Sequence, residues 1–355
     1  MTRREKFLKT VRRELEGYIP YYFTLSPAAL AKFKAKTGRE DYAEYYDFPI
    51  KFIRHRPKPK NTDFFKYYDN LPHDAIIDFW GVANVKGSFE HFLRMHHPME
   101  KYSGIDEFAN YPYPDPVNDF DWLPVEQEIR QARENDYITY SAPGSLGPTL
   151  FEIAWYLRGM DSFMMDMIDE PELANYHLDR ITEIRCEGAR RYAAAGVDVI
   201  RLGDDVGTQR DLMISRELFV EYLKPRYKKI ISAAKEVNPG ILIDFHCDGN
   251  IIKIIADFIE AGVDILNPVQ PECMDPVEVK KIFGSRLSFN GTLGVQTTIP
   301  FGTADDVDRV CREMIEKVGR GGGLILAPTH VIEPEVPWEN VEAYLEAIKK
   351  YSKIL

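Results

Sequence analysis

The chain contains 355 residues, with 45 Lys and Arg against 56 Asp and Glu, and its formal net charge is −11 at pH 7. This acidic balance argues against a nucleic-acid-binding protein, because such proteins neutralise phosphates with Lys and Arg. With 45% hydrophobic and 28% charged residues, the composition is that of a globular protein that is folded throughout.

Short apolar runs rich in β-branched and aromatic residues predict eight strands. In chain order they lie at 18–25, 75–82, 137–143, 197–203, 241–247, 263–269, 286–292 and 323–329. From about residue 195 a helical pattern follows each run, which is typical of βα units with a parallel sheet. Two of these helices have clear starts: Asp275-Pro276 places proline directly after a capping residue, and Thr303 with Asp306 resembles a capping box.

Eight alternating units without a break in composition favour one (β/α)₈ TIM barrel over an open doubly wound sheet. We therefore predict a single domain over residues 1–355, with an N-terminal extension before the first strand. The segment at about 83–135 is rich in Pro, Asp and aromatic residues and is too long for a simple connection. We expect it to be an insertion that forms a lid over the barrel mouth.

In such a barrel the active site lies where strands end and βα loops begin. The sharpest motif there is FHCDGN, in which alternation along the strand lets His246 and Asp248 face one ion while Cys247 faces the barrel wall. If the strand has already turned, Cys247 is the softer and better zinc ligand. His330 follows the last strand and can reach the same cavity, which would complete the ligand set of a catalytic zinc. Alternatively, His246 and Asp248 form a hydrogen-bonded pair without a metal, and His330 binds a substrate oxygen.

Adjacent acids at the end of a strand point to opposite faces, so at most one of Asp204 and Asp205 enters the cavity. We expect that one to be a general base or substrate anchor, while its neighbour caps a helix or meets an arginine. Other polar residues follow strands at Gln270, Asn290 and Glu333. The aromatic residues Tyr21, Tyr22 and Trp80 are candidates for a substrate pocket, although core packing explains them equally well.

Two long C-terminal runs are FIEAGVDILNPVQPECMDPVEVKKIFGSRLSFNGTLGVQTTIPFGTADDV and GGGLILAPTHVIEPEVPWENVEAY. They resemble the uroporphyrinogen decarboxylase superfamily, which also contains zinc and corrinoid-linked methyltransferases. The runs PYYFTLSPAAL and GMDSFMMDMIDEPELANYHLDRI extend the resemblance more loosely into the first half. The resemblance implies a (β/α)₈ barrel.

The decarboxylase branch holds a polyanionic tetrapyrrole with an arginine-bearing segment near the first strand and a catalytic aspartate after the second. Here GYIPYYFTLSP contains no arginine, and IIDFWGVA has aromatic residues and glycine at the expected acid position, with Asp78 inside the strand. A pocket without those cations would have to hold many carboxylates in an already acidic protein. Tetrapyrrole decarboxylation is therefore the less favoured branch.

The methyltransferase branch holds zinc with a His-x-Cys pair after a mid-barrel strand and a third ligand after the last strand. By this resemblance His246 matches the histidine, Asp248 falls at the cysteine, and His330 falls at the third ligand. Cys247 is the substitute ligand, and Glu333 is a candidate fourth or supporting group. Replacing thiolates by oxygen and nitrogen makes the site harder, which suits a methoxy oxygen better than a thiol.

The resemblance thus implies a methyltransferase that moves a methyl group between a small methylated substrate and the cobalamin of a separate corrinoid protein, with zinc as the expected metal. Asp204, Asp205 and His330 are the expected catalytic residues. The expected substrate contacts are Tyr21, Tyr22, Trp80, Gln270 and Asn290. The alternatives are a tetrapyrrole decarboxylase and a non-enzymatic tetrapyrrole- or corrinoid-binding protein.

Scattered cysteines without a CxxC pair, and an N-terminus without an apolar signal region, predict a cytoplasmic protein. No stretch is apolar and long enough to span a membrane. We therefore expect neither a membrane nor a nucleic-acid partner, and a homodimer is the candidate assembly.

Overall fold

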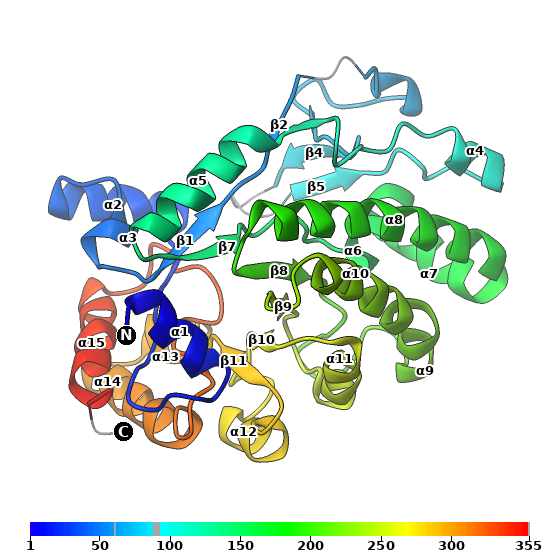
Figure 1. Cartoon of the computed structure of the whole chain (residues 1–355). Helices are drawn as coiled ribbons and strands as arrows, with labels where there is room; N and C mark the ends of the chain where they lie inside the picture. The colour runs from blue at the N-terminus through cyan, green and yellow to red at the C-terminus, as the bar shows by residue number, and fades with distance from the viewer. Residues whose placement is uncertain (60–61, 88–92, 354–355) are drawn as a thin grey trace.

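The computed structural model describes residues 1–59, 62–87 and 93–353. At its centre a seven-stranded parallel sheet curls around the core, with helices on its outside (Figure 1). The strand order is β1-β7-β8-β9-β10-β11-β12. The strands are β1 (Ile50–Ile53), β7 (Ile138–Ser141), β8 (Val199–Gly203), β9 (Leu242–His246), β10 (Ile265–Asn267), β11 (Ser288–Asn290) and β12 (Leu324–Ile325). This confirms the predicted α/β class and its parallel sheet.

The extended N-terminal segment at 18–25 lies beside the last strand. Isolated parallel bridges join Tyr21 to Leu326 and Leu25 to Ile332. The predicted first strand is therefore placed next to β12, where a closed barrel would put it, but it makes single bridges instead of a continuous ladder.

Helices follow the strands as the sequence predicts, and their caps explain where they begin. Asp275 Oδ1 accepts a hydrogen bond from Val277 N at 2.8 Å, and Thr303 and Asp306 form a reciprocal capping box. The α-helices are α1 (Arg3–Val11), α2 (Pro27–Thr37), α3 (Tyr42–Tyr45), α4 (Ile105–Ala109), α5 (Trp122–Glu134), α6 (Phe151–Arg158), α7 (Met160–Asp169), α8 (Pro171–Ala195), α9 (Arg216–Leu218), α10 (Lys224–Val237), α11 (Ile255–Ala261), α12 (Pro276–Phe283), α13 (Thr298–Phe301), α14 (Ala304–Glu313) and α15 (Trp338–Tyr351). Single turns of 3₁₀ helix lie at Phe65–Tyr67 and Ile252–Ile254, and π-helical turns at Phe219–Leu223 and Met314–Val318.

The prediction of a central strand at 75–82 is wrong. Only Ile76–Ile77 is extended there, as β3, and it pairs antiparallel with β4. Asp78 Oδ1 accepts hydrogen bonds from Trp80 N at 2.9 Å and Val82 N at 3.0 Å, and Gly81 has φ +90°, so the chain turns instead of continuing as a strand. The place in the central sheet belongs to β1, which pairs with β7 in the register Ile50 to Ile138.

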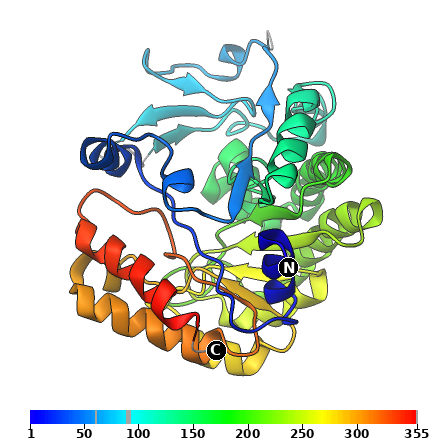
Figure 2. The ribbon, with the colours of Figure 1, turned by 60° about the vertical axis from the view of Figure 1, so that its left-hand side comes forward.

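Between β1 and β7 the chain forms small antiparallel sheets before returning through α5. One sheet has the order β3-β4-β5, with β4 at Ala83–Lys86 and β5 at Leu93–His96, and the other pairs β2 (Arg56–Pro57) with β6 (Phe120–Asp121). Figures 1 and 2 show this region on one side of the molecule, opposite α12, α14 and α15. None of the helices in the described ranges is both long and apolar enough to cross a membrane.

Candidate metal and substrate site

A cavity of about 310 Å³ opens at the C-terminal ends of the central strands. Side chains from the ends of β8, β9 and β10 line it, together with residues of the N-terminal segment and of the loops after β7 and β12. The lining residues that bear on function are Tyr22, Phe52, Glu152, Arg201, Asp205, His246, Asn267 and His330. The cavity therefore lies where catalysis occurs in barrel enzymes.

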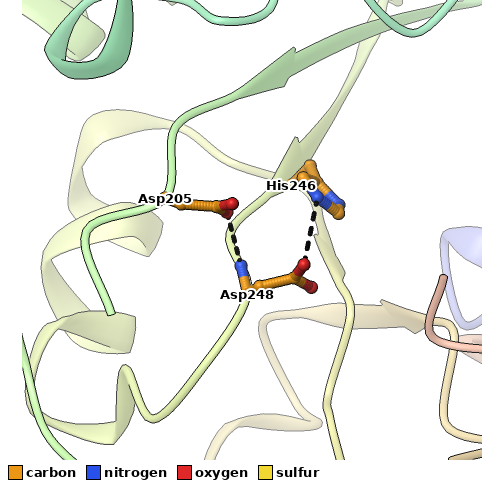
Figure 3. Close-up of side chains that lie close together, drawn as sticks. All are labelled: Asp205, His246 and Asp248. Carbon is orange, nitrogen blue, oxygen red and sulfur yellow. Dashed lines mark hydrogen bonds and ion pairs between the residues drawn. The ribbon is translucent and has the colours of Figure 1, made fainter. Parts of the chain in front are cut away.

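Asp205, His246 and Asp248 form the one cluster in the described residues whose ligand atoms all lie within 4.8 Å of one another (Figure 3). His246 Nε2 is 3.8 Å from Asp248 Oδ2, which allows one ion to contact both at about 2.1 Å. Asp205 Oδ1 accepts a hydrogen bond from Asp248 N at 2.8 Å, which holds the two loops together. The donor set of two carboxylates and an imidazole fits a divalent ion.

A tight turn brings Asp248 back over the strand end. Gly249 has φ +88°, and a Cβ at this position would lie 2.6 Å from the carbonyl oxygen of Thr208. Gln270 Oε1 accepts a hydrogen bond from Gly249 N at 3.2 Å. Gln270, which we predicted to bind substrate, thus supports the loop that carries Asp248.

The ring of His246 is oriented by Asn267. Nδ1 of His246 lies 2.6 Å from Asn267 Oδ1, and Asn267 Nδ2 donates to the carbonyl oxygen of Asn290 at 2.8 Å. The second bond fixes which end of the Asn267 amide is the oxygen, so Nδ1 of His246 carries the proton. Nε2, which faces Asp248, keeps its lone pair for a metal or a proton.

The other predicted ligands lie in different positions. Cys247 is fully buried, Val206 N donates to its Sγ at 3.5 Å, and burial holds the pKa of this thiol well above its usual value. Its thiol lies against Val206 and is not a member of the cluster. His330 lines the cavity with its ring centroid 6.5 Å from that of His246, and Glu333 lies beyond the cluster in the same loop.

Burial changes the protonation of the groups around the cluster. It raises the pKa of Asp248, against the opposing effect of His246, and it lowers the pKa of His330. A neutral His330 has an unprotonated ring nitrogen, so it can accept a proton or bind a metal from its place in the cavity wall.

The structure separates the two adjacent acids. Asp204 is fully buried and accepts hydrogen bonds from the backbone N–H groups of Leu150, Phe151 and Glu152 at 2.7, 3.1 and 2.9 Å. Burial raises its pKa to about 6. Asp204, predicted as a catalytic candidate, therefore holds the start of α6 and does not face the cavity, whereas Asp205 does.

Sequence reasoning missed Glu152 as a site residue. Its Oε2 accepts a hydrogen bond from Asp205 N at 3.1 Å, and its Oε1 accepts one from Tyr156 OH at 2.8 Å. Burial, together with the charges of Asp204 and Asp205, raises its pKa to about 8. Its position in the first turn of α6 carried no signal, because a glutamate at a helix start is normally solvated.

Arg201 and Asn267 were also missed. Arg201 lies in the middle of β8, within an apolar run, and its side chain points into the cavity. A charged residue inside a predicted buried strand was the available signal, because such a residue is rarely buried without a partner.

Of the predicted substrate contacts, Tyr22 lines the cavity and the others lie elsewhere. Tyr21 OH donates to Tyr46 O at 3.1 Å on the outer side of the segment. Trp80 is buried in the region between β1 and β7, where the Arg185 guanidinium lies 4.7 Å from its ring. Asn290 is buried deeper in the barrel, and its Nδ2 donates to Asp244 Oδ2 at 2.7 Å.

Comparison with known proteins gives relatives in both branches. Over 208 residues the chain is 30% identical to the methylcobamide:CoM methyltransferase MtaA of Methanosarcina barkeri. The aligned residues make up 59% of this chain and 57% of that protein. It is 23% identical over 235 residues to uroporphyrinogen decarboxylase 2, chloroplastic, of Oryza sativa subsp. japonica, with 64% and 58% covered. The chain thus matches only a little over half the length of these relatives.

A solved structure of a methyltransferase from Methanosarcina mazei superposes with a TM-score of 0.71 over 99% of both chains, at 22% sequence identity. At that identity the likeness establishes the fold. The family model for uroporphyrinogen decarboxylase (URO-D) matches residues 143–351, more than half of the chain, and these residues include the whole Asp205, His246 and Asp248 cluster. The chain belongs to the uroporphyrinogen decarboxylase family, and its identity to the methyltransferase MtaA exceeds its identity to the rice decarboxylase.

Proposed function

We propose that this protein is a methyltransferase that moves a methyl group between a small methylated substrate and the cobalamin of a corrinoid protein, assisted by a divalent metal. The observation that carries the proposal is the Asp205, His246 and Asp248 cluster at the strand ends, of which Asp205 and His246 also line the cavity. The relationship to MtaA supports the same reaction class.

Asp205, His246 and Asp248 would hold the metal, with zinc as the expected ion and His330 close enough to bind substrate or to join the ion after a small movement. When bound, the metal supplies Lewis acidity to the heteroatom that carries the methyl group. Methyl transfer breaks the bond between the methyl carbon and that heteroatom and forms a bond from the carbon to Co(I), which becomes Co(III). The heteroatom keeps the electron pair and takes up a proton.

The protein's own residues prepare this site in three ways. Asn267 keeps the Nε2 lone pair of His246 directed at Asp248. The Gly249 turn and Gln270 support the loop that carries Asp248, whose Oδ2 lies 3.8 Å from His246 Nε2. Tyr22 and Phe52 form an apolar wall, and their ring centroids are 5.5 Å apart.

Tetrapyrrole decarboxylation fits the cavity less well. Among the described residues that line it, Arg201 is the only Arg or Lys, so a single cation would face several carboxylates. A volume of about 310 Å³ also lies at the lower end of the range for ligand pockets. A polycarboxylate would therefore be crowded, and most of its negative charges would have no cationic partner in the cavity.

We further propose that segment 18–25 closes the sheet as its eighth strand, so that residues 1–355 form one (β/α)₈ barrel domain with the region around 83–135 inserted. Its bridges to Leu326 and Ile332 support this. A cytoplasmic location and a homodimer remain predictions.

Methyl transfer is tested directly with a corrinoid protein reduced to cob(I)alamin. In a screen of methoxy-aromatics, methylamines and methyl thioethers, the zinc-loaded enzyme should form methylcobalamin from at least one donor, as followed by absorbance, and Asp248→Asn should not. Uroporphyrinogen should be left unchanged. Metal-independent release of carbon dioxide from uroporphyrinogen would establish the decarboxylase instead, and tetrapyrrole or corrinoid binding without turnover of any substrate would establish a binding protein.

A further inference from the structure

Arg201 forms no ion pair with Asp244, its partner on the neighbouring strand. Arg201 on β8 and Asp244 on β9 are partners in the parallel ladder, so their side chains start next to each other. Asp244 Oδ2 instead accepts a hydrogen bond from Asn290 Nδ2 at 2.7 Å, and the Tyr140 hydroxyl is a second partner of this carboxylate. The guanidinium of Arg201 reaches past this layer toward the strand ends, where the cavity lies.

The groups to which Arg201 donates hydrogen bonds there are a phenol and an amide. Its Nη1 donates to Tyr22 OH at 3.2 Å and its Nη2 to Asn267 Oδ1 at 2.5 Å, and Nη2 lies 3.1 Å from His246 Nδ1. Over the ranges that the structure describes, no carboxylate lies within ion-pair distance of Arg201. A guanidinium is charged at every accessible pH, and neither of these two acceptors is a carboxylate, so the charge of Asp244 acts on Arg201 only through space. The arrangement keeps a cation ready for an anion that enters the cavity.

The other charged groups around the cavity are acidic and do not bind an incoming anion. Asp244 faces Arg201 from β9 at a greater distance, while Asp205 and Asp248 belong to the metal cluster, where a divalent ion would neutralise them. Glu152 is hydrogen-bonded to Asp205 N and to Tyr156. With the cluster neutralised, Arg201 is the group in the cavity wall that attracts an anion.

The rest of the cavity sets the size and shape of what accompanies that anion. Tyr22 and Phe52 line one wall, and the volume of about 310 Å³ suits a molecule built on a single ring. The metal cluster lies next to Arg201, because both contact His246. An anionic group and a methylated heteroatom on one small molecule can therefore reach Arg201 and the cluster together.

We infer that the methyl donor of this site is a small methylated carboxylic acid whose carboxylate pairs with Arg201, with the methoxybenzoates as its simplest representatives. The role of this acid as methyl donor rests on the proposed function. The binding of its carboxylate rests on Arg201 alone. A bidentate arginine–carboxylate pair supplies both affinity and orientation.

Equilibrium binding to the zinc-loaded protein tests the inference without catalysis. Calorimetry compares ortho-, meta- and para-methoxybenzoate with methoxybenzene, which lacks only the carboxylate. At least one acid should bind the unmodified protein about 10- to 100-fold more tightly than methoxybenzene. Arg201→Gln should reduce that ratio to less than about threefold, and Arg201→Lys should give an intermediate value. Arg210→Gln, which removes a positive charge from the exposed loop after β8, should leave the ratio unchanged.

Equal binding of the acids and methoxybenzene to the unmodified protein would overturn the inference, and this comparison needs no variant. A preference for the acid that persists in Arg201→Gln would also overturn it, because the carboxylate would then bind the metal. Failure of the proposed function looks different. If the acids bind through Arg201 but no methyl group reaches cob(I)alamin, methyl transfer is wrong and the carboxylate site stands.

Discussion

Asn267 Oδ1 lies 2.6 Å from Nδ1 of His246, and this contact decides which nitrogen of the imidazole faces the cluster. The same oxygen accepts a hydrogen bond from Arg201, so one amide joins the proposed metal ligand to the proposed carboxylate-binding residue. A side chain that orients a ligand histidine raises metal affinity without touching the metal.

Asn267→Leu should lower zinc affinity by about 10- to 100-fold, because His246 is then free to rotate or to protonate at Nε2. Asn267→Asp keeps an acceptor oxygen for Nδ1 and should restore most of the affinity. Competition with a chromogenic chelator measures both, with the melting temperature recorded to exclude unfolding. Unchanged affinity in Asn267→Leu would remove Asn267 from any role at the metal.

The unmodified protein should bind close to one equivalent of zinc. Asp205→Asn, His246→Ala and Asp248→Asn should each lose it, because they remove the three members of the cluster. Cys247→Ala is the matched control: its thiol is buried against Val206, so zinc content should not change. Metal analysis after zinc loading measures all four variants. Loss of zinc in Cys247→Ala alone would show that the loop turns differently and that the thiolate is the ligand.

Sequence patterns predicted the second half of the fold well, but in the first half they chose the wrong segment for one central strand, for a physical reason. Strands β8 to β12 are buried on both faces, so they appear as continuous apolar runs with capped helices between them. β1 is only four residues long and includes the exposed Lys51, whereas the more apolar run at 75–82 is bent by the Asp78 turn. Local composition favoured the wrong segment, and the pairing with β7 decided the right one.

The same difference applies to the site. His246, Asp248 and Asp205 were predictable, because residue types and strand alternation place them at a strand end. The orienting contact from Asn267 and the position of Arg201 depend on side chains from three neighbouring strands. Spacing along one strand contains no information about such contacts.

Asp204→Ala and Asp205→Ala should have opposite effects. Removing the Asp204 carboxylate leaves three backbone N–H groups and Tyr227 OH without their acceptor, which should cost about 2–4 kcal/mol of unfolding free energy. Asp205→Ala should cost less stability, because this carboxylate accepts a single backbone hydrogen bond, from Asp248 N, and it should lose zinc and methyl transfer. Urea titration together with metal analysis distinguishes them. Equal destabilisation by both substitutions would mean that Asp205, too, is structural.

Protonation of His177 on α8 should contribute to the pH dependence of the unfolding free energy. Its ring is fully enclosed: Nε2 lies 3.1 Å from the carbonyl oxygen of Ala154, Nδ1 lies 3.1 Å from Tyr113 OH, and the ring of Phe108 lies 4.9 Å away. Burial lowers its pKa to about 4, from an ordinary value of 6.5.

Below pH 6.5 this histidine is therefore protonated in the unfolded chain. In the folded protein it becomes protonated only at about pH 4. Stability should consequently fall as the pH is lowered through this window, by about 3 kcal/mol from His177. His177→Gln should remove that part of the fall, as measured by urea titrations at pH 7 and at about pH 4.5. Because His55, whose pKa burial also lowers to about 4, and the buried acids are the same in both proteins, their contributions cancel in the difference. Parallel curves for the two proteins would mean that His177 accepts its proton in the folded state, and that the enclosure by Phe108 and Tyr113 opens readily.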